Sequence, residues 1–282
     1  MIMKIKITSD STCDLSKELI EKYNIGIIPL IIIKDSVEHR DGVDIVPSDI
    51  FAHVAAGGDL CSTAALGVGE YQEYFNNLIG DYDGILHINI GSGFSSCHQN
   101  ACLAAEEFDN VKVVDSMNLS TGQGLVVLKA CELAQTCNTL EELHAQVQAF
   151  TERVEASFLL DQLKYMVKGG RCSSAAALGA NLLNLKPCIE VKGGKMSVVK
   201  KYRGNYAKCL ANYVKDRLTN RDDLDMWTLF VTHTPVTEEC EQAVAAAVAE
   251  CNQFDNTYWT EAGCTVSCHC GPSTLGVLFV RK

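Results

Sequence analysis

Short runs of aliphatic and β-branched residues alternate with longer amphipathic runs through the first half of the chain, which restricts the folds open to it. The runs at 4–9, 25–33, 84–90 and 111–115 have the composition of strands. The run at 25–33 is apolar at nearly every position, so we expect one buried strand there. Because strands separated by segments of helical length pair in parallel, the sequence predicts an α/β protein that begins with a mainly parallel sheet, with helices on both faces.

The second half of the chain follows a different pattern, which predicts a smaller mixed α/β domain. The pattern changes near Phe158, and a length of 282 residues suits two modest domains. We therefore divide the chain into an N-terminal α/β domain at 1–157 and a C-terminal α/β domain at 158–282. Gly193-Gly194, between two apolar runs, predicts a β-hairpin.

The remaining elements follow from hydrophobic periodicity. Asp14 is expected to cap the first helix. An Ala/Leu-rich stretch occupies 173–185, and no element is assigned to the Gly-, Cys- and Ser-rich tail from Gly263. Helices are predicted at 15–23, 47–56, 70–79, 95–108, 121–136, 140–155, 161–167, 206–218 and 238–251, and further strands at 158–160, 227–232 and 257–261.

Charge and hydropathy exclude several classes of protein. With 24 basic and 35 acidic side chains the net charge is −11, whereas nucleic-acid-binding proteins present a basic face, so no nucleic-acid partner is expected. The longest apolar run, 25–33, is far shorter than the roughly 20 residues of a membrane span. Stable membrane insertion is therefore not expected, which leaves transient membrane contact open. No secretory signal is recognisable, so we expect a cytoplasmic protein whose 14 cysteines are reduced.

Cysteine and histidine lie close together near the C-terminus, at Cys264, Cys268, His269 and Cys270. Adjacent ligands would point in alternating directions in an extended segment, and the chain contains no C-x-x-C pair. We therefore predict no metal and no cofactor. The other cysteines are expected to be small buried apolar residues.

Small hydroxyl residues and an acidic residue occur in loops next to predicted strands, where parallel sheets bind their ligands. Ser11 follows the first strand, Thr63 precedes the helix at 70–79, and Asp115 ends the strand at 111–115. Taken alone, Ser11 fits a ligand contact and the capping of a turn equally well, and Asp115 fits a cap or a group that orients a partner hydroxyl. Thr63, taken alone, is better explained as a cap.

The loop at 91–96 is a further candidate for binding a ligand. Gly93 lets the backbone approach a ligand closely, and the amides at the start of the next helix favour an anion. The spacing departs from G-x-G-x-x-G at Ser96, and it is not the G-x-S-x-G of serine hydrolases. The loop alone fits an anionic or polar group and a plain tight turn equally well. Arg171, after two glycines, adds a cation suited to a carboxylate or phosphate.

Taken together and in order, these segments resemble the DegV family of fatty-acid-binding proteins, which includes the FakB subunits of bacterial fatty acid kinase. The resemblance covers essentially the whole chain. The matching segments are TSDSTCDL at 8–15, Thr63 with GEY at 69–71, GSGFS at 91–95, VDS and GQG at 114–116 and 122–124, LKYMVKGGR at 163–171, LKP and RG at 185–187 and 203–204, and HCGPSTLG at 269–276. The chain departs from the family pattern at 64–66, 91, 96–97 and 273.

The resemblance implies two α/β domains and one fatty acid, with its carboxylate at the polar loops and its acyl chain in an apolar tunnel of the C-terminal domain. It further implies a carrier without catalysis of its own, which presents the fatty acid to a separate fatty acid kinase for phosphorylation. The residues implied at the head group are Thr63, Ser92, Gly93, Ser95, Arg171 and His269, with Ser11 and Asp115 supporting the polar loops. Because Ser95 could simply cap its helix, Ser92→Ala is expected to weaken binding more than Ser95→Ala.

Two other functions stay open. The chain could be a regulatory protein that senses lipid without a kinase partner. A small-molecule hydrolase or phosphotransferase is less well supported, because no Ser-His-acid order, Walker loop or metal-ligand set is present. The length and saturation of the fatty acid and the oligomeric state are not predicted.

Overall fold

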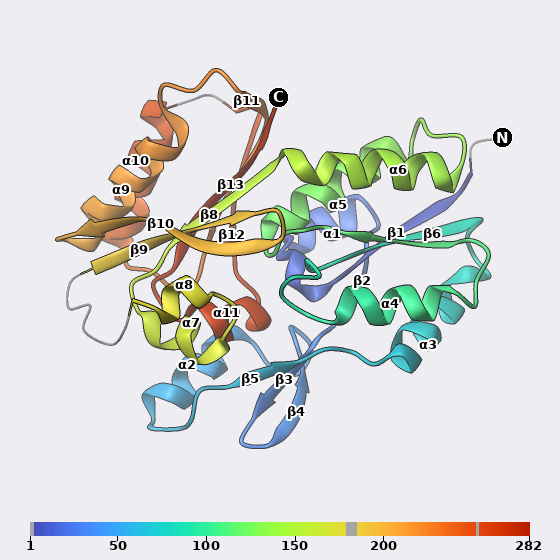
Figure 1. Cartoon of the computed structure of the whole chain (residues 1–282), viewed down its shortest axis with the longest axis horizontal. Coiled ribbons are helices and arrows are strands. Elements are labelled where there is room, and N and C mark those ends of the chain that lie inside the picture. Colours follow the sequence, from blue (N-terminus) through green and yellow to red (C-terminus); the bar gives the residue numbers. More distant parts are fainter. Residues whose placement is uncertain (1–2, 179–184, 252–253) are drawn as a thin grey trace.

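The computed structural model describes residues 3–178, 185–251 and 254–282. It places two large β-sheets side by side with helices around them, and a third, small sheet lies below them (Figure 1). One sheet has four strands and the other has six. The predicted α/β fold class is confirmed. The predicted domain boundary at 157–158 falls within β8 (Val154–Leu159), which belongs to the six-stranded sheet, and the division into two domains stays a prediction.

The four-stranded sheet has the order β2-β1-β6-β7, and all of its neighbouring strands are parallel. Helices α5 and α6 cover one face, and α3 and α4 cover the other (Figure 1). The central strand β6 is buried at every position, as expected between two helix layers. The bounds are β1 (Ile5–Asp10), β2 (Gly26–Ile28), β6 (Gly84–Asn89), β7 (Val111–Asp115), α3 (Val68–Ile79), α4 (Cys97–Ala105), α5 (Thr121–Leu133) and α6 (Leu140–Phe150).

The six-stranded sheet is mixed, with the order β10-β9-β8-β13-β11-β12 and one parallel pair, β11 with β12. The predicted hairpin is confirmed: Gly193 and Gly194 have φ of 54° and 70°, the left-handed conformations that a two-residue turn needs. Helices α9 and α10 form a separate core with this sheet. The bounds are β9 (Leu185–Lys192), β10 (Lys195–Arg203), β11 (Leu224–His233), β12 (Asn256–Glu261), β13 (Leu275–Arg281), α9 (Tyr206–Leu218) and α10 (Glu238–Cys251).

The prediction of one strand at 25–33 is wrong. Pro29 lacks an N–H donor and interrupts the run, so β2 ends at Ile28 and β3 (Ile31–Lys34) enters a different sheet. This small antiparallel sheet has the order β4-β3-β5, with β4 (Val37–Arg40) and β5 (Ser62–Ala64) on either side. Thr63, expected in a loop, therefore lies in a strand.

The cap predicted for the first helix is also wrong. Helix α1 (Lys17–Lys22) begins two residues later than expected, and Ser16 Oγ accepts a hydrogen bond from the Leu19 amide at 3.3 Å. Asp14 adopts a left-handed conformation with φ of 49° and bonds to distant parts of the chain instead.

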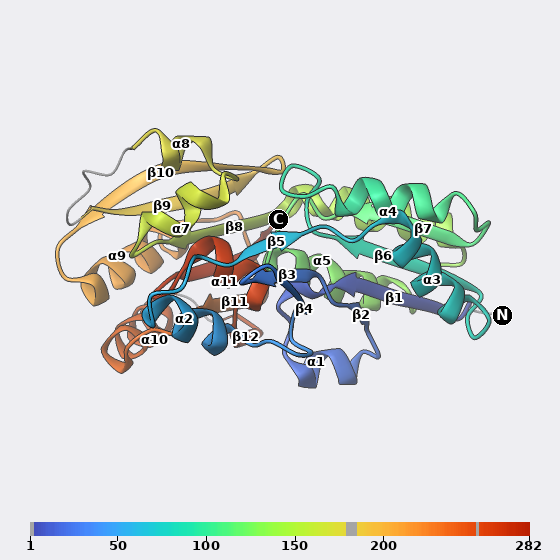
Figure 2. The ribbon, with the colours of Figure 1, turned by 90° about the horizontal axis from the view of Figure 1, so that it is seen from below.

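The Gly- and Cys-rich tail, to which no element was assigned, forms α11 (Cys264–Cys270) and β13. Figure 2 shows α11 close to α2, α7 and the small sheet. Residues 179–184 of the Ala/Leu-rich stretch lie outside the described residues. The other short elements are η1 (Ser11–Cys13), α2 (Pro47–Ala55), η2 (Thr151–Arg153), α7 (Leu163–Gly169) and α8 (Ser173–Ala176).

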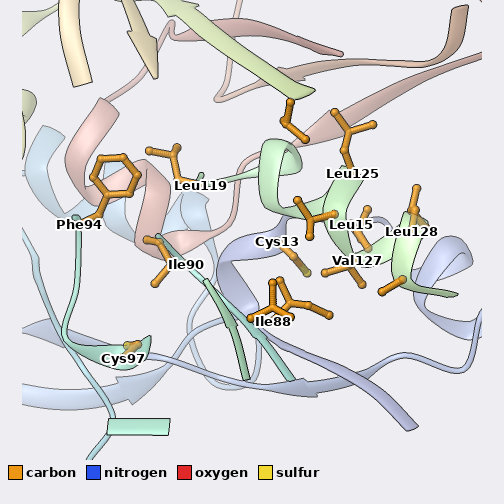
Figure 3. Close-up of a cluster of buried hydrophobic side chains, with 14 of the residues drawn as sticks. Cys13, Leu15, Ile88, Ile90, Phe94, Cys97, Leu119, Leu125, Val127 and Leu128 are labelled. Carbon is orange, nitrogen blue, oxygen red and sulfur yellow. The ribbon is translucent and has the colours of Figure 1, made fainter. Parts of the chain in front are cut away.

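Helix α5 joins the two halves of the molecule, because it contacts β1 and β6 of the parallel sheet as well as β8, β11 and β13 of the mixed sheet. Four consecutive residues, 125–128, are buried, so the helix has no solvent-facing side there. Figure 3 shows Leu125, Val127 and Leu128 within this core, with Ile90, Phe94 and Leu119 grouped nearby. Within the described ranges, no helix has the length and hydropathy needed to cross a membrane.

Candidate functional site

A cavity of about 160 Å³ lies where loops of the parallel sheet meet α7, α11 and β10. Four of the residues predicted at the head group, Thr63, Ser95, Arg171 and His269, lie in its wall. The rest of the wall is mainly apolar. It consists of Leu30, Ala64, Ala65, Ile90, Phe94, Ser96, Leu119, Met166, Met196, Thr265, Val266 and Cys270.

Helix α11 is fixed beside the cavity by two carboxylates from the start of the chain. Asp41 accepts hydrogen bonds from the amides of Cys264 and Thr265 at 2.8 and 3.1 Å, and from the Thr265 hydroxyl at 2.7 Å. Asp14 accepts one from the Gly263 amide at 2.9 Å. These bonds satisfy amides at the start of the helix that have no partner within it, and they hold its last turn against the cavity.

His269, in that last turn, pairs with Thr63 of β5, and the two atoms Nε2 and Oγ1 are 2.9 Å apart. Burial, and to a lesser degree the nearby Arg171 guanidinium, lowers the pKa of His269 from 6.5 to about 4. The imidazole is therefore neutral at physiological pH. A neutral ring is at once a donor and an acceptor, so the pair offers a polar surface without a fixed charge.

Arg171 supplies the positive charge of the site. Its guanidinium donates to the carbonyl oxygens of Gly169 at 2.7 Å and Phe94 at 3.3 Å, and it has no carboxylate partner among the described residues. The two preceding glycines are required by the geometry. A Cβ on Gly169 would lie 2.3 Å from His269 Nδ1, and Gly170 ends α7 with φ of 68°. With no carboxylate partner among the described residues, the guanidinium of Arg171 can pair with an anion that enters the cavity.

The loop after β6 brings Ser95 to the cavity but not Ser92 or Gly93. Ser95 Oγ accepts a hydrogen bond from the Cys97 amide at 3.3 Å and donates to Cys97 Sγ at 3.1 Å. Ser92 is exposed, and its amide donates to Asp115 at 3.0 Å. Gly93 packs against the hairpin, since a Cβ there would lie 2.1 Å from the Gly194 oxygen.

Ser11 and Asp115, predicted to support the polar loops, both make hydrogen bonds to loop backbone. Ser11 Oγ donates to Asp41 at 3.0 Å and accepts from the Leu30 amide at 3.1 Å. It thereby connects the residue before β3 to the carboxylate that binds the first amides of α11. Asp115 accepts from the amides of Ser92 and Met117. Neither lies in the cavity wall.

Comparison with known proteins identifies the family. Residues 4–282 match the family model described as "Uncharacterised protein, DegV family". The chain belongs to the DegV family. A DegV domain-containing protein of Clostridium acetobutylicum is 30% identical over 283 residues, covering 99% of both chains.

Solved DegV-family structures have the same fold. A DegV-family protein from Thermus thermophilus, whose structure is described as one of fatty acid binding, superposes with a TM-score of 0.89 at 25% identity, covering 99% of this chain and 100% of that one. DegV from Bacillus subtilis, described as a fatty acid binding protein, gives a TM-score of 0.81 at 25% identity, with the same coverage.

A buried polar network beneath this DegV-family site was not predicted. The carboxylate of Asp10 accepts hydrogen bonds from the Ile90 amide at 2.8 Å, from Asn89 at 3.2 Å and from Gln123 at 2.9 Å. It thereby fixes the point at which β6 passes into the loop that carries Ser95. Burial raises the pKa of Asp10, and these donors oppose that shift. Its position in the opening TSDSTCDL segment is the sequence signal that could have revealed it.

The apolar wall was also not predicted residue by residue, because its side chains come from distant segments. Met166 of α7, Met196 of β10 and Val266 of α11 meet only in the folded chain. No carboxylate occurs in the wall, so among the described residues the cavity combines one guanidinium with an otherwise neutral lining. Over the same described ranges, no group of three or more His, Cys, Asp or Glu side chains is arranged to hold a metal ion.

Proposed function

We propose that this DegV-family protein binds one long-chain fatty acid, with the carboxylate near Thr63, Ser95, Arg171 and His269 and the acyl chain along the apolar wall. The description of two relatives as fatty-acid-binding proteins, at 25% identity over the whole chain, supports the proposal. Neither Ser92 nor Gly93 lies in the wall, so the proposal gives them a role in shaping the loop.

The observation that carries the proposal is one cavity whose wall combines Thr63, Ser95, Arg171 and His269, which we call the polar end, with a mainly apolar remainder, which we call the apolar end. A carboxylate removed from water must be paired or hydrogen-bonded, and the polar end provides a guanidinium, two hydroxyls and a neutral imidazole. Apolar burial contributes roughly 0.8 kcal/mol per methylene. A long tail therefore supplies most of the affinity, and the polar end orients the head group.

The test is mass spectrometry of an organic extract of the purified native protein. About one fatty acid per chain is the expected result. A polar metabolite in its place, with no fatty acid recovered, would refute the proposal. Refolding the delipidated protein and titrating it with octadecanoic acid checks that an empty preparation was not simply stripped during purification.

We further propose that the protein presents the fatty acid to a separate kinase and performs no catalysis itself. Arg171 supports this part, because it is exposed at the polar end and has no carboxylate partner among the described residues. A cytoplasmic location belongs to the same proposal, since ATP is the usual phosphoryl donor of a kinase and all 14 cysteines are free thiols.

The proposed kinase step is tested by measuring acyl-phosphate formation in the presence of a fatty acid kinase and ATP. Arg171→Ala and His269→Ala are expected to reduce acyl-phosphate formation at least tenfold more than they reduce fatty-acid retention. Lys168→Ala is a matched control for Arg171→Ala, because it removes a positive charge three residues away and outside the cavity wall. An equal loss of acyl-phosphate formation and of fatty-acid retention in folded variants would contradict the proposal that these side chains act mainly in the kinase step. Fatty-acid binding without any kinase-dependent product would favour a lipid sensor.

A further inference from the structure

A chain of hydrogen-bonding side chains runs from the cavity wall into the parallel sheet. Its outer member is Ser95 in the wall, whose hydroxyl donates to Cys97 Sγ at 3.1 Å. The Tyr71 hydroxyl interacts with the same sulfur and accepts a hydrogen bond from Asn89 at 3.0 Å. Asn89 also donates to Asp10, at the centre of the buried network. The chain therefore connects a wall residue of the candidate site to the fixed polar groups beneath it.

Cys97 holds the Ser95 hydroxyl at two points. It is the first residue of α4, it is fully buried, and it belongs to the core cluster drawn in Figure 3. Its backbone amide donates to Ser95 Oγ at 3.3 Å, and its sulfur accepts the hydroxyl proton. Burial raises the pKa of the Cys97 thiol, so the sulfur is uncharged at physiological pH. Cys97 thus sets the direction of the Ser95 O–H bond.

The hold of the sulfur on the Ser95 proton is weak. A neutral thiol sulfur is a weak hydrogen-bond acceptor, whereas an ionised carboxylate is a strong one. The sulfur is also shared with Tyr71. Because a hydroxyl hydrogen rotates to suit its partner, the Ser95 proton can turn from the sulfur to a carboxylate in the cavity at little cost. The Cys97 amide meanwhile keeps Ser95 Oγ in place.

An oxygen in place of the sulfur would change this balance. A serine or threonine hydroxyl is a better acceptor than a thiol, so at position 97 it would compete with the ligand for the Ser95 proton. Removing the acceptor altogether would leave the ligand no competitor. Packing alone predicts the opposite order, since serine is close to cysteine in size and alanine leaves a gap in a buried position.

Resting on the proposed function, we propose that Cys97 is a positioning residue of the fatty-acid site, whose sulfur holds the Ser95 hydroxyl weakly and so releases it to the carboxylate of the ligand. Cys97 itself lies outside the cavity wall. It acts on binding through Ser95, and its effect disappears when Ser95 has no hydroxyl.

The experiment measures the dissociation constant of octadecanoic acid, by displacement of a fluorescent fatty acid from delipidated protein. Cys97→Ser is expected to weaken binding about fivefold, the value of one hydrogen bond, and Cys97→Ala to change it less than twofold. Cys131→Ser and Cys131→Ala are the matched controls, because Cys131 is a buried cysteine on α5 outside the cavity wall. Neither control should change the dissociation constant twofold.

A double-mutant cycle shows whether Cys97 acts through Ser95. The variant that combines Ser95→Ala with Cys97→Ser is expected to bind octadecanoic acid within twofold of Ser95→Ala alone. A further fivefold loss in the double variant would show that position 97 acts through the packing of α4, and it would overturn the proposal.

Two results for the single variants would also overturn the proposal: unchanged binding by Cys97→Ser, or weaker binding by Cys97→Ala than by Cys97→Ser. If the unaltered protein does not bind octadecanoic acid, the proposed function fails instead. Should thermal unfolding show that Cys97→Ser does not fold, Cys97→Thr replaces it, because it also places an oxygen there and has the same expected loss. If Cys97→Ala does not fold, the double-mutant cycle decides alone.

Discussion

The polar and apolar ends of the cavity are built in different ways. At the polar end, Thr63, Ser95, Arg171 and His269 come from four separate segments, and each is held by a directional hydrogen bond to a named partner. At the apolar end, side chains such as Met196 and Val266 contribute surface without directional contacts. Apolar burial scales with area, whereas hydrogen bonding depends on geometry. On the proposed function, the apolar residues therefore control the affinity for the fatty acid, and the polar residues control the orientation of its head group.

The largest effect is expected from a charge introduced at the apolar end. Met196→Glu on the edge strand β10 is expected to weaken octadecanoic acid binding about 1,000-fold, because an ionised carboxylate resists removal from water and repels the ligand's own carboxylate. Met196→Leu, which keeps the volume and polarity, should bind nearly as the unaltered protein does. A loss below tenfold for Met196→Glu would mean that the acyl chain does not run along this wall.

A smaller effect, on stability, is expected at the polar end. Since folding lowers the pKa of His269 from 6.5 to about 4, the unfolded chain takes up a proton here at a higher pH than the folded one. The stabilising contribution is complete above pH 6.5 and is lost as the pH falls toward 4, by up to about 3 kcal/mol.

Urea unfolding of the unaltered protein and of His269→Gln, between pH 7 and pH 4, measures this difference. His87, whose pKa is lowered to about 3 by burial, titrates in both proteins and cancels. Parallel stability curves for the two proteins would show that the imidazole of His269 is not held neutral.

The smallest effect separates two serines of one loop. The positions of the two serines favour the opposite order to the one expected from sequence, because Ser95 lies in the cavity wall and Ser92 is exposed outside it. Ser95→Ala is expected to weaken fatty-acid binding about fivefold, the value of one hydrogen bond, and Ser92→Ala less than twofold. A titration of both variants decides between the two orders, and a larger loss for Ser92→Ala would restore the original one.

The sequence revealed the polar end better than the apolar end, for a physical reason. Polar ligands sit in short loops between a strand and a helix, and hydroxyl and glycine residues are conspicuous there, as at 91–96. The positions of Met166, Met196 and Val266 depend on tertiary packing, and in sequence they look like ordinary core residues.

The wrong predictions of secondary structure also have local causes. Pro29 divides an apolar run that periodicity alone treats as continuous, and Thr63 joins an edge strand too short to show alternation. Helix α11 is not predicted from sequence, because its Cys- and Ser-rich segment, CTVSCHC, has little helical propensity of its own. Its helical form depends on the carboxylates of Asp14 and Asp41, which no local pattern reveals.

The attachment of α11 also has a consequence for the order of folding during synthesis. Asp14 and Gly263 are 249 residues apart in sequence, and Asp41 and Cys264 are 223 apart. Contacts of such range form late, because the chain between them must first be translated and become ordered. A nascent chain that has completed the parallel sheet still lacks the helix that carries His269. The proposed fatty-acid site is therefore complete only after residue 270 has left the ribosome.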